Sequence, residues 1–401
     1  MADRDLLQRI TDKSKEYAGY TAENLSRLVR LPSLSCGEKE TAEELKRQME
    51  EAGFDEVRID GLGNVLGRIG AGRRILALDA HIDTVDVGNR ENWSFDPFCG
   101  TVKDGHVLGR GTVDQKGGAA AFVTAGRIVK DLDLSGDVTL YCTGTVMEED
   151  CDGLCWKYLV EEENLRPQVV ISTEPTNLGV YRGQRGRMEM EVRFKGLSAH
   201  GSAPERGRNA VYMASRVCLA IEGLNPRLAD DAFLGRGSIT VSQFVSGSPS
   251  LCAVADFAKI HIDRRLTWGE TKEKAVAEIR ELAAREGGVV LVPEYRAKAY
   301  TGLEYGMEKY YPTWKLPEDH EAVIRGKSVF KELYGRPARV DKWTFSTNGV
   351  TINGIYGIPG IGFGPGSEVL AHAPDERVPV SDLEQASAFY AAYVLAMAEG
   401  A

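Results

Sequence analysis

The sequence predicts a layered α/β protein whose sheet is mainly parallel, with a smaller α+β unit inserted into it. In the 401-residue chain, apolar strand-like segments alternate with helical segments up to about residue 175, and the alternation resumes after residue 320. Such alternation is typical of a layered α/β domain. Residues 187–293 instead carry mainly strand patterns with two helices. We therefore predict a discontinuous larger domain over residues 1–186 and 294–401, and an inserted domain over residues 187–293.

The elements of the larger domain are predicted in order from local patterns. Apolar residues at helical spacing predict a helix over residues 6–29 and a second over residues 41–52. Apolar runs predict strands, and 3.6-residue periodicity predicts the helices between them. The next elements are strands 64–70 and 74–81, helix 117–132, strand 137–146, helix 152–163 and strand 168–175. After the insertion follow helix 320–334, a glycine-rich strand and loop over 353–366, and helix 381–398.

The inserted domain is predicted to be an independent α+β unit. Its expected strands cover residues 188–196, 238–247, 258–266 and 289–295, and its expected helices cover residues 209–221 and 271–285.

Composition and charge exclude several classes of protein. With 43% hydrophobic and 27% charged residues, the chain has the composition of an ordinary globular protein. Its net charge of -10 works against binding to nucleic acid or anionic lipid. No segment approaches the roughly 18 consecutive apolar residues of a membrane span, and the N-terminal sequence has no signal-like apolar stretch. Seven cysteines without paired CxxC spacing favour reduced thiols, so we expect a cytoplasmic protein.

Possible metal ligands follow the predicted strands, where functional groups of an open α/β sheet gather. They are His81, Asp114, Glu148, Glu149, Glu174 and His372. Two imidazoles with several carboxylates suit zinc, manganese or cobalt. Taken singly, each residue is more often a structural histidine, a helix cap or a solvated acidic turn. Their common placement at strand ends favours a metal site.

Other catalytic motifs are absent. The segment Gly109–Gly118 lacks the Gly-Lys-Ser/Thr ending of a phosphate-binding loop, and Gly362–Gly366 has a proline where a dinucleotide-binding turn needs backbone amides. The sequence has no GxSxG motif, and no cysteine has an obvious histidine partner. We therefore expect neither nucleotide binding nor a covalent nucleophile.

Six motifs occur in the order and spacing of a known family. They are His81-Ile82-Asp83, the segment from Gly109-Arg110-Gly111 to Asp114-Gln115-Lys116-Gly117-Gly118, Glu148-Glu149, Ser172-Thr173-Glu174-Pro175, Ser198-Ala199-His200-Gly201-Ser202-Ala203-Pro204 and His372. The chain resembles the zinc-dependent amidohydrolases and peptidases that include acetylornithine deacetylase, succinyl-diaminopimelate desuccinylase, aminoacylase and carboxypeptidase G. It is also similar to a branch of selenium-metabolism-linked hydrolases. The resemblance implies a catalytic α/β domain with two metal ions and an inserted lid domain that forms a homodimer.

The resemblance also implies the metal ligands. His81 and Glu174 would hold one ion, Glu149 and His372 the other, and Asp114 would bridge them. Zinc is the expected metal, with cobalt and manganese as alternatives.

Two carboxylates beside these ligands receive other roles from the resemblance. The carboxylate of Asp83 would accept the free imidazole N–H of His81 and orient it. Glu148 would be the general base that moves a proton from metal-activated water to the leaving amine. The alternative for Glu148 is a weak third metal ligand.

Substrate-binding roles are implied for residues outside the metal cluster. His200 would stabilise the oxyanion and reach the partner subunit's active site; the alternative is a histidine that caps a turn. Arg265, in an Asp-x-Arg segment, would grip a substrate carboxylate, whereas Arg264 would face the other way as a surface charge. The backbone of Gly364 and Gly366 would cradle the same carboxylate.

These residues predict a hydrolase that cleaves an amide or peptide bond in a small substrate with a free carboxylate, such as an N-acyl amino acid or short peptide. Two departures from the family pattern leave the acyl group open. An expected asparagine is missing from Leu251–Asp256, and Thr347-Asn348-Gly349 replaces Thr-Asp-Ala. The alternatives are an N-carbamoyl (ureido) amino acid amidohydrolase and a catalytically inactive metal-binding scaffold.

Overall fold

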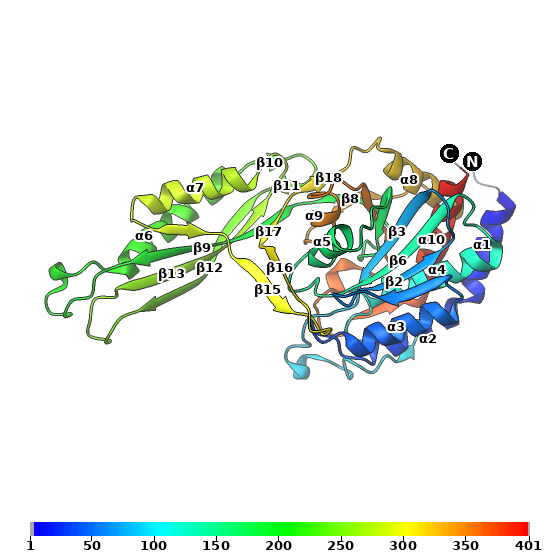
Figure 1. Ribbon diagram of the computed structural model, residues 1–401, viewed down its shortest axis with the longest axis horizontal. Coiled ribbons are helices and arrows are strands. Elements are labelled where there is room, and N and C mark those ends of the chain that lie inside the picture. Colours follow the sequence, from blue (N-terminus) through cyan, green and yellow to red (C-terminus); the bar gives the residue numbers. More distant parts are fainter. Residues whose placement is uncertain (1–3, 400–401) are drawn as a thin grey trace.

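A nine-stranded sheet forms the centre of the larger domain (Figure 1). The computed structural model describes residues 4–399. The strand order is β1-β2-β6-β3-β7-β20-β8-β18, and β19 also pairs with β8. The strands are β1 Glu56–Ile59, β2 Val65–Ile69, β3 Arg74–His81, β6 Val138–Thr145, β7 Val169–Ser172, β8 Val180–Gln184, β18 Trp314–Lys315, β19 Val340–Trp343 and β20 Gly360–Gly362. The four central strands β6, β3, β7 and β20 are parallel, so the predicted α/β class is confirmed.

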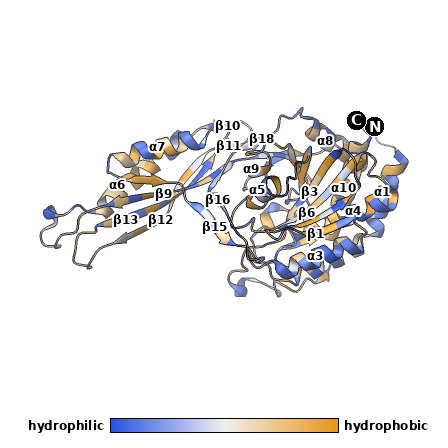
Figure 2. Ribbon diagram, viewed as in Figure 1, coloured by the Kyte–Doolittle hydropathy of each residue, from blue (hydrophilic) through white to orange (hydrophobic). Residues whose placement is uncertain are grey.

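Helices cover this sheet and share its apolar core. They are α1 Arg4–Glu16, α2 Ala18–Val29, α3 Lys39–Glu51, α4 Lys116–Leu132, α5 Leu154–Glu161, α8 Glu321–Tyr334, α9 Gly349–Ile352 and α10 Val380–Ala398. Helices α4 and α10 pack on each other and on β3 and β6. Figure 2 shows the hydrophobic colour concentrated on the central strands and α10, whereas α3 at the surface is largely hydrophilic. Helices and loops cover both faces of the central strands, and the sequences of these strands are therefore nearly continuous apolar runs.

The predicted helix over residues 6–29 is two helices. The chain leaves helical geometry at Tyr17, between α1 and α2. The hydroxyl of Tyr17 hydrogen-bonds Asp131 in α4, and the Arg127 guanidinium lies 4.5 Å from the Tyr17 ring centroid. These contacts with α4 fix Tyr17 at the break, and helical spacing alone could not show them.

The inserted domain is a second sheet with its own core, and it extends away from the larger domain (Figure 1). Its antiparallel order is β12-β13-β9-β14, with β17 also pairing with β9. The elements are β9 Gly186–Lys195, α6 Ala210–Glu222, β12 Ser238–Gly247, β13 Phe257–Leu266, α7 Lys272–Ala284, β14 Val289–Leu291 and β17 Tyr310–Tyr311. The buried residues of this core run from Met188 to Val290. The exact domain boundaries stay a prediction, since β17 joins this sheet from beyond residue 293.

The remaining strands form small sheets. β15 Glu294–Lys298 and β16 Glu304–Glu308 make a hairpin between the two domains (Figure 1). β4 Val102–Lys103, β5 His106–Leu108 and β21 Arg377–Pro379 form a three-stranded sheet, and β10 Asp230–Asp231 pairs with β11 Gly235–Arg236. Within residues 4–399, no helix is both long enough and apolar enough to cross a membrane.

Candidate functional site

The predicted metal ligands meet at the carboxyl ends of three parallel strands. His81 is the last residue of β3, and it lies opposite Thr145, the last residue of β6. Glu148 and Glu149 follow β6, and Glu174 follows β7. Because parallel strands end at the same edge of a sheet, their trailing residues come together. Loops before α4 and before β21 bring Asp114 and His372 to the same place.

Asp114 lies between the two imidazoles. Its Oδ1 is 2.9 Å from His81 Nε2, and its Oδ2 is 3.2 Å from His372 Nε2. His372 Nε2 is also 3.0 Å from Glu149 Oε2. On the other side, His81 Nε2 lies 3.6 Å from Glu174 Oε1 and 3.8 Å from Glu148 Oε2. Asp114 thus lies between a group of side chains around His81 and a group around His372.

The donor chemistry of this cluster fits divalent cations. Ligand atoms of His81, Glu148 and Glu174 lie within 4.8 Å of one another, as do those of His81, Asp114 and Glu149. Burial raises the pKa values of Glu148, Glu149 and Glu174, and nearby carboxylates raise them further. Within the described residues, Glu148 Oε1 and Glu174 Oε2 have no hydrogen-bond partner. A cation held here would offset this concentration of buried negative charge.

Asp83 organises the turn that carries Glu148 and Glu149. Its carboxylate accepts hydrogen bonds from the backbone N–H groups of Glu148 at 3.2 Å and Glu149 at 3.1 Å, and from Ser35 Oγ at 2.7 Å. His81 Nδ1 lies 2.9 Å from the backbone oxygen of Asp83 and 3.5 Å from its carboxylate. The predicted orientation of His81 by Asp83 therefore comes mainly from the main chain, and the carboxylate holds the acidic turn.

A cavity of about 330 Å³ opens onto the cluster. Its lining comprises Asp114, Glu148, Glu149, Asp152, Glu174, Arg187, Arg265, Phe345, Ser346, Glu368, Ala371 and His372. Arg265 reaches it from β13, and Asp263 accepts hydrogen bonds from its Nε at 2.8 Å and Nη2 at 3.1 Å. A second guanidinium, Arg187 of β9, pairs directly across the sheet from Arg265 and forms an ion pair with Asp152 at 3.3 Å. Sequence reasoning missed Arg187, since only the strand register reveals it.

Arg264 is not the surface charge that strand alternation predicted. Its side chain is fully buried, and its Nη2 lies 2.6 Å from Glu270 and 3.0 Å from Glu278. Arg264 does face away from Arg265, but α7 and the residues preceding it cover that face of the sheet. Alternation gives the direction of a side chain, not what lies there.

The structure does not bring His200 to the cluster of the same chain. His200 is exposed in the loop between β9 and α6, where its Nδ1 lies 2.7 Å from Ser202 Oγ. Cys252, in the segment that departs from the family pattern, adjoins this loop and accepts a hydrogen bond from Gly201. A role for His200 in catalysis therefore requires a second subunit or a movement of the inserted domain.

The amides of Gly364 and Gly366 donate hydrogen bonds within the chain. Gly364 N–H donates to Thr176 Oγ1 at 3.0 Å, and Gly366 N–H donates to Asp382 at 3.2 Å. Glycine is required at position 364 for another reason: an added Cβ would lie 2.1 Å from the carbonyl oxygen of Glu174. Gly364 thus lets the glycine-rich loop pack against the segment that presents Glu174.

Asn348 lies beneath the cluster and outside the cavity lining. Its Nδ2 donates to Asp79 Oδ2 at 2.9 Å, and its Oδ1 accepts from the backbone of Gly153 at 2.9 Å. Asp79 is fully buried in β3 and also accepts hydrogen bonds from Thr143 and Thr145 of β6. An aspartate at position 348 would place a second carboxylate against Asp79, so this departure belongs to the buried framework.

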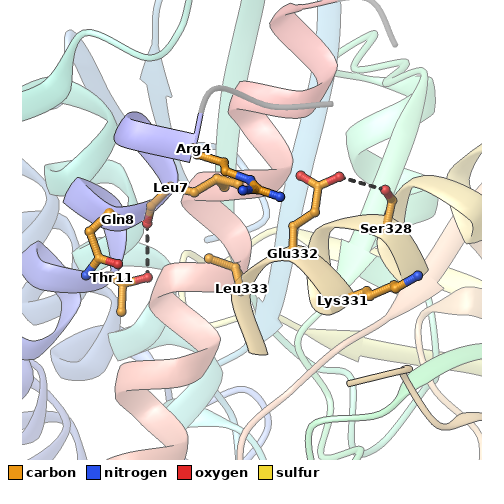
Figure 3. A pocket seen from close by; sticks show the side chains of 8 residues that line it. All are labelled: Arg4, Leu7, Gln8, Thr11, Ser328, Lys331, Glu332 and Leu333. Atoms are coloured by element: carbon orange, nitrogen blue, oxygen red, sulfur yellow. Dashed lines mark hydrogen bonds between the residues drawn. The ribbon is translucent and has the colours of Figure 1, made fainter. Parts of the chain in front are cut away.

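A larger hollow of about 700 Å³ lies elsewhere, between α1 and α8 (Figure 3). It is lined by Arg4, Leu7, Gln8, Thr11, Ser328, Lys331, Glu332 and Leu333. Its hydroxyls make helix-local hydrogen bonds, from Thr11 to the Leu7 carbonyl and from Ser328 to Glu332. Among the described residues, no histidine or cysteine lines it. The smaller cavity beside Asp114 is therefore the better candidate for the active site.

Comparisons with known proteins identify the family of the chain. Residues 77–396 match Peptidase family M20/M25/M40. The protein YgeY of Escherichia coli (strain K12) is 51% identical over 397 residues, which cover 98% of each chain. Succinyl-diaminopimelate desuccinylase of Cereibacter sphaeroides (strain ATCC 17029 / ATH 2.4.9) is 28% identical over 384 residues, 90% of this chain and 95% of the relative.

The fold is shared with the Bacillus subtilis YXEP protein, a dinuclear metal binding peptidase from the M20 family. The two are 15% identical with a TM-score of 0.71, covering 96% of this chain and 100% of that one. The resemblance inferred from the six sequence motifs is confirmed by the family match. The chain belongs to peptidase family M20/M25/M40, and it is a hydrolase of amide or peptide carbon–nitrogen bonds.

Proposed function

We propose that the protein is a dimeric hydrolase with two metal ions that cleaves an amide or peptide bond next to a free carboxylate. N-acyl amino acids and short peptides are the substrate class. The observation that carries this proposal is the cavity that contains both the Asp114 cluster and the Arg265 guanidinium. A substrate anchored by its carboxylate at Arg265 would present its amide bond to the cluster.

The proposed ligands are His81 and Glu174 for one ion, Glu149 and His372 for the other, and Asp114 for both. The approach of both imidazoles to opposite oxygens of Asp114 supports this division. The dinuclear site of the related Bacillus subtilis YXEP protein also supports it. Zinc is the first candidate, with cobalt or manganese as alternatives. When bound, such ions supply Lewis-acid activation of water and of the amide carbonyl.

Glu148 is the proposed general base. Its carboxylate is buried beside the cluster, and burial raises its pKa. A raised pKa suits a group that must take a proton from the attacking water and then deliver it to the leaving amine. Its position near both His81 and Glu174 also fits the alternative role of a third metal ligand.

Arg265 is the proposed anchor for the substrate carboxylate. Asp263 occupies its Nε and Nη2 and thereby orients the guanidinium, while Nη1 has no partner in the described part of the chain. Replacing Arg265 with lysine keeps the charge but loses the planar fork. We expect R265K to raise KM about tenfold or more for carboxylate substrates, with little change for the matching substrate amides.

The proposed dimer forms through the inserted domain. β12 is an edge strand of its sheet, and Phe244 and Val245 on it are 41% exposed. Tyr212 and Leu219 of α6 are exposed as well. An edge strand with exposed apolar residues suits pairing with a second copy. The dimer would give His200 of the partner subunit access to the active site, where it would stabilise the oxyanion.

We also propose a cytoplasmic location, which the seven free cysteines support. The proposed substrate class is tested with a panel of N-acetyl, N-succinyl and N-carbamoyl amino acids and dipeptides, using protein loaded with zinc or cobalt. Chelator-sensitive release of a free amino acid from acyl substrates or dipeptides is the expected result. Release of ammonia and carbon dioxide would instead identify a ureido substrate. Absence of turnover across the panel would favour a metal-binding scaffold.

A further inference from the structure

Arg110 and Glu376 form a buried ion pair behind the metal cluster. Arg110 Nη1 lies 2.6 Å from Glu376 Oε2, and the two side chains are 3% and 0% exposed. The Arg110 guanidinium also lies 5.1 Å from the Trp93 ring centroid. Neither member of the pair lines the cavity, so neither can contact a substrate there.

Each member of the pair holds one of the loops that carry a proposed ligand. Glu376 Oε1 accepts hydrogen bonds from the backbone N–H groups of Val113 at 2.7 Å and Asp114 at 3.1 Å. Arg110 donates to the backbone carbonyls of His372 at 3.4 Å and Ala373 at 3.3 Å. Each residue therefore reaches across to the other's loop, since Arg110 precedes Asp114 and Glu376 follows His372.

The His372 loop needs such support. His372 lies outside helices and strands, and its φ of +59° is in the left-handed region that residues with a side chain rarely occupy. A backbone in this region persists where its surroundings hold it. The hydrogen bond from Arg110 to the His372 carbonyl acts on this residue directly. The spacing of the sequence motifs does not predict this hydrogen bond.

We propose that the Arg110–Glu376 pair is a positioning device that sets the separation of Asp114 and His372. It thereby controls affinity for the ion that Asp114, Glu149 and His372 would hold together. This inference rests on the proposed function, because it requires that these residues bind metal. Residues that orient ligands in this way typically change metal affinity by about 10- to 100-fold when they are replaced.

A structural role alone must be separated from this positioning role, because breaking any buried ion pair destabilises a fold. The inserted domain supplies a matched control. Arg264 and Glu270 are also buried, at 0% and 1% exposure, and are also 2.6 Å apart. Glu376→Gln and Glu270→Gln therefore make the same chemical change in buried pairs, but only Glu376 is hydrogen-bonded to a loop that carries a proposed ligand. Arg264 keeps Glu278 as a second partner in E270Q.

The experiment measures cobalt and zinc binding to metal-free protein by calorimetry, together with thermal unfolding without metal. For E376Q we expect one of the two ions to bind about 10- to 100-fold more weakly, whereas E270Q binds both with wild-type affinity. Arg110→Lys gives a second test if E376Q does not fold. Lysine keeps the charge but lacks the planar guanidinium that contacts both carbonyls and Glu376 at once. This substitution should also weaken the binding of one ion.

Three outcomes would overturn the proposal. Wild-type affinities for both ions in E376Q and R110K would reduce the pair to a structural role. Equal weakening in E376Q and E270Q would point to a general effect of lower stability. Absence of metal binding by the wild-type protein would refute the proposed function itself, and the positioning role with it.

Discussion

The carboxylates of the two sheets are in opposite electrostatic situations. At the edge of the central sheet, burial and neighbouring carboxylates raise the pKa values of Glu148 and Glu174, although His81 acts in the opposite direction. On the inserted sheet, burial also opposes ionisation of Glu189 and Glu191, but basic partners outweigh it and lower both pKa values. Lys309 and His261 contact Glu189 at 2.9 and 3.0 Å, and Lys259 contacts Glu191 at 2.7 Å.

This difference separates carboxylates that stabilise the fold through ion pairs from carboxylates that are candidates for binding a ligand. Basic side chains of the same chain balance the charges of Glu189 and Glu191, so these carboxylates do not require a bound cation. Among the described residues, the cluster around Asp114 brings together more carboxylates than basic side chains, and burial with the neighbouring Asp114 raises the pKa of Glu149. Such an imbalance in a cavity is a feature of functional sites.

The largest expected effect is on Glu148. Glu148→Gln removes the proposed base with little change in size, and we expect kcat to fall about 10²- to 10⁴-fold, the usual contribution of general acid–base catalysis. Metal content should not change. Glu191→Gln in the inserted sheet is the matched control and should leave kcat unchanged. Steady-state kinetics with metal analysis checks this, and high residual turnover in E148Q would reject Glu148 as the base.

The next effect concerns His200, which tests whether the inserted domain is only a structural unit. His200→Ala should lower kcat by about 10²- to 10³-fold, as removal of an oxyanion donor does, with a smaller change in KM. If His200 acts across a two-fold dimer, mixing H200A with E148Q subunits creates one intact site in each mixed dimer.

An equal mixture that exchanges subunits fully should then recover roughly a quarter of wild-type activity, because about half of the dimers are mixed and each has one intact site. No recovery, in a mixture whose subunit exchange has been verified by mass, would show that His200 acts within its own chain or not at all. Either subunit alone is the control.

Metal removal should affect the two sheets unequally. Saturating zinc or cobalt, at about 100 to 1,000 times Kd, should stabilise the metal-free protein by about 3–4 kcal/mol. Hydrogen exchange should slow in the turn after β6 that carries Glu148 and Glu149, and stay unchanged in β9 and β13. Equal protection of both sheets would show that the ions stabilise the molecule as a whole and not the cluster.

The sequence predicted those parts of the molecule that depend on local pattern. Strands β3, β6 and β7 were predicted as apolar runs, and His81 and Glu174 were predicted as ligands because they follow such runs. The glycine at position 364 was also predicted to matter, and the structure adds a reason that the sequence did not show, its close packing against Glu174.

The remaining features depend on contacts that spacing cannot show. Arg187 lines the cavity because β9 and β13 pair with Arg187 opposite Arg265. Arg264 is buried because α7 covers the face toward which it points. Glu376 supports Asp114 through backbone hydrogen bonds across 262 residues of sequence. In each case the deciding fact is which element pairs with or packs against a residue, and that is set by the tertiary fold.

The prediction least connected with catalysis concerns Glu38, a buried carboxylate near the cluster that is not a proposed ligand. Its Oε1 accepts hydrogen bonds from the backbone of Cys36 and Met147, both at 3.0 Å, and its Oε2 has no partner among the described residues. Burial, with a contribution from Asp83, raises its pKa to about 8. Glu38 therefore tests whether every buried carboxylate that lacks a basic side-chain partner belongs to a metal site.

Because the pKa of Glu38 is higher in the folded state than the ordinary 4.5, its contribution to stability is complete below pH 4.5 and is lost as pH rises through about 8. Glu38→Gln keeps the acceptor oxygen but does not titrate. It should be close to wild-type stability near pH 5 and exceed it near pH 9 by about 4–5 kcal/mol, since each of the roughly 3.5 units between 4.5 and about 8 corresponds to about 1.4 kcal/mol. Urea unfolding of both proteins across this range measures the difference.

Glu191→Gln is the control with the opposite sign, because the pKa of Glu191 is lowered by its basic partners. The stability that Glu191 contributes is present above its ordinary pKa of 4.5 and is lost as pH falls, so E191Q should be less stable than wild type at pH 7 and approach it in acid. If E38Q instead lost stability at pH 9, Glu38 would be ionised and balanced in the fold, and its environment would resemble that of the inserted sheet. A stability difference between E38Q and wild type that grows with pH would show that Glu38, like Glu148 and Glu174, is a buried acid with a raised pKa. Because Glu38 is not a proposed ligand, a raised pKa alone would then not identify the candidate metal centre. Proximity to Asp114 would be the distinguishing feature.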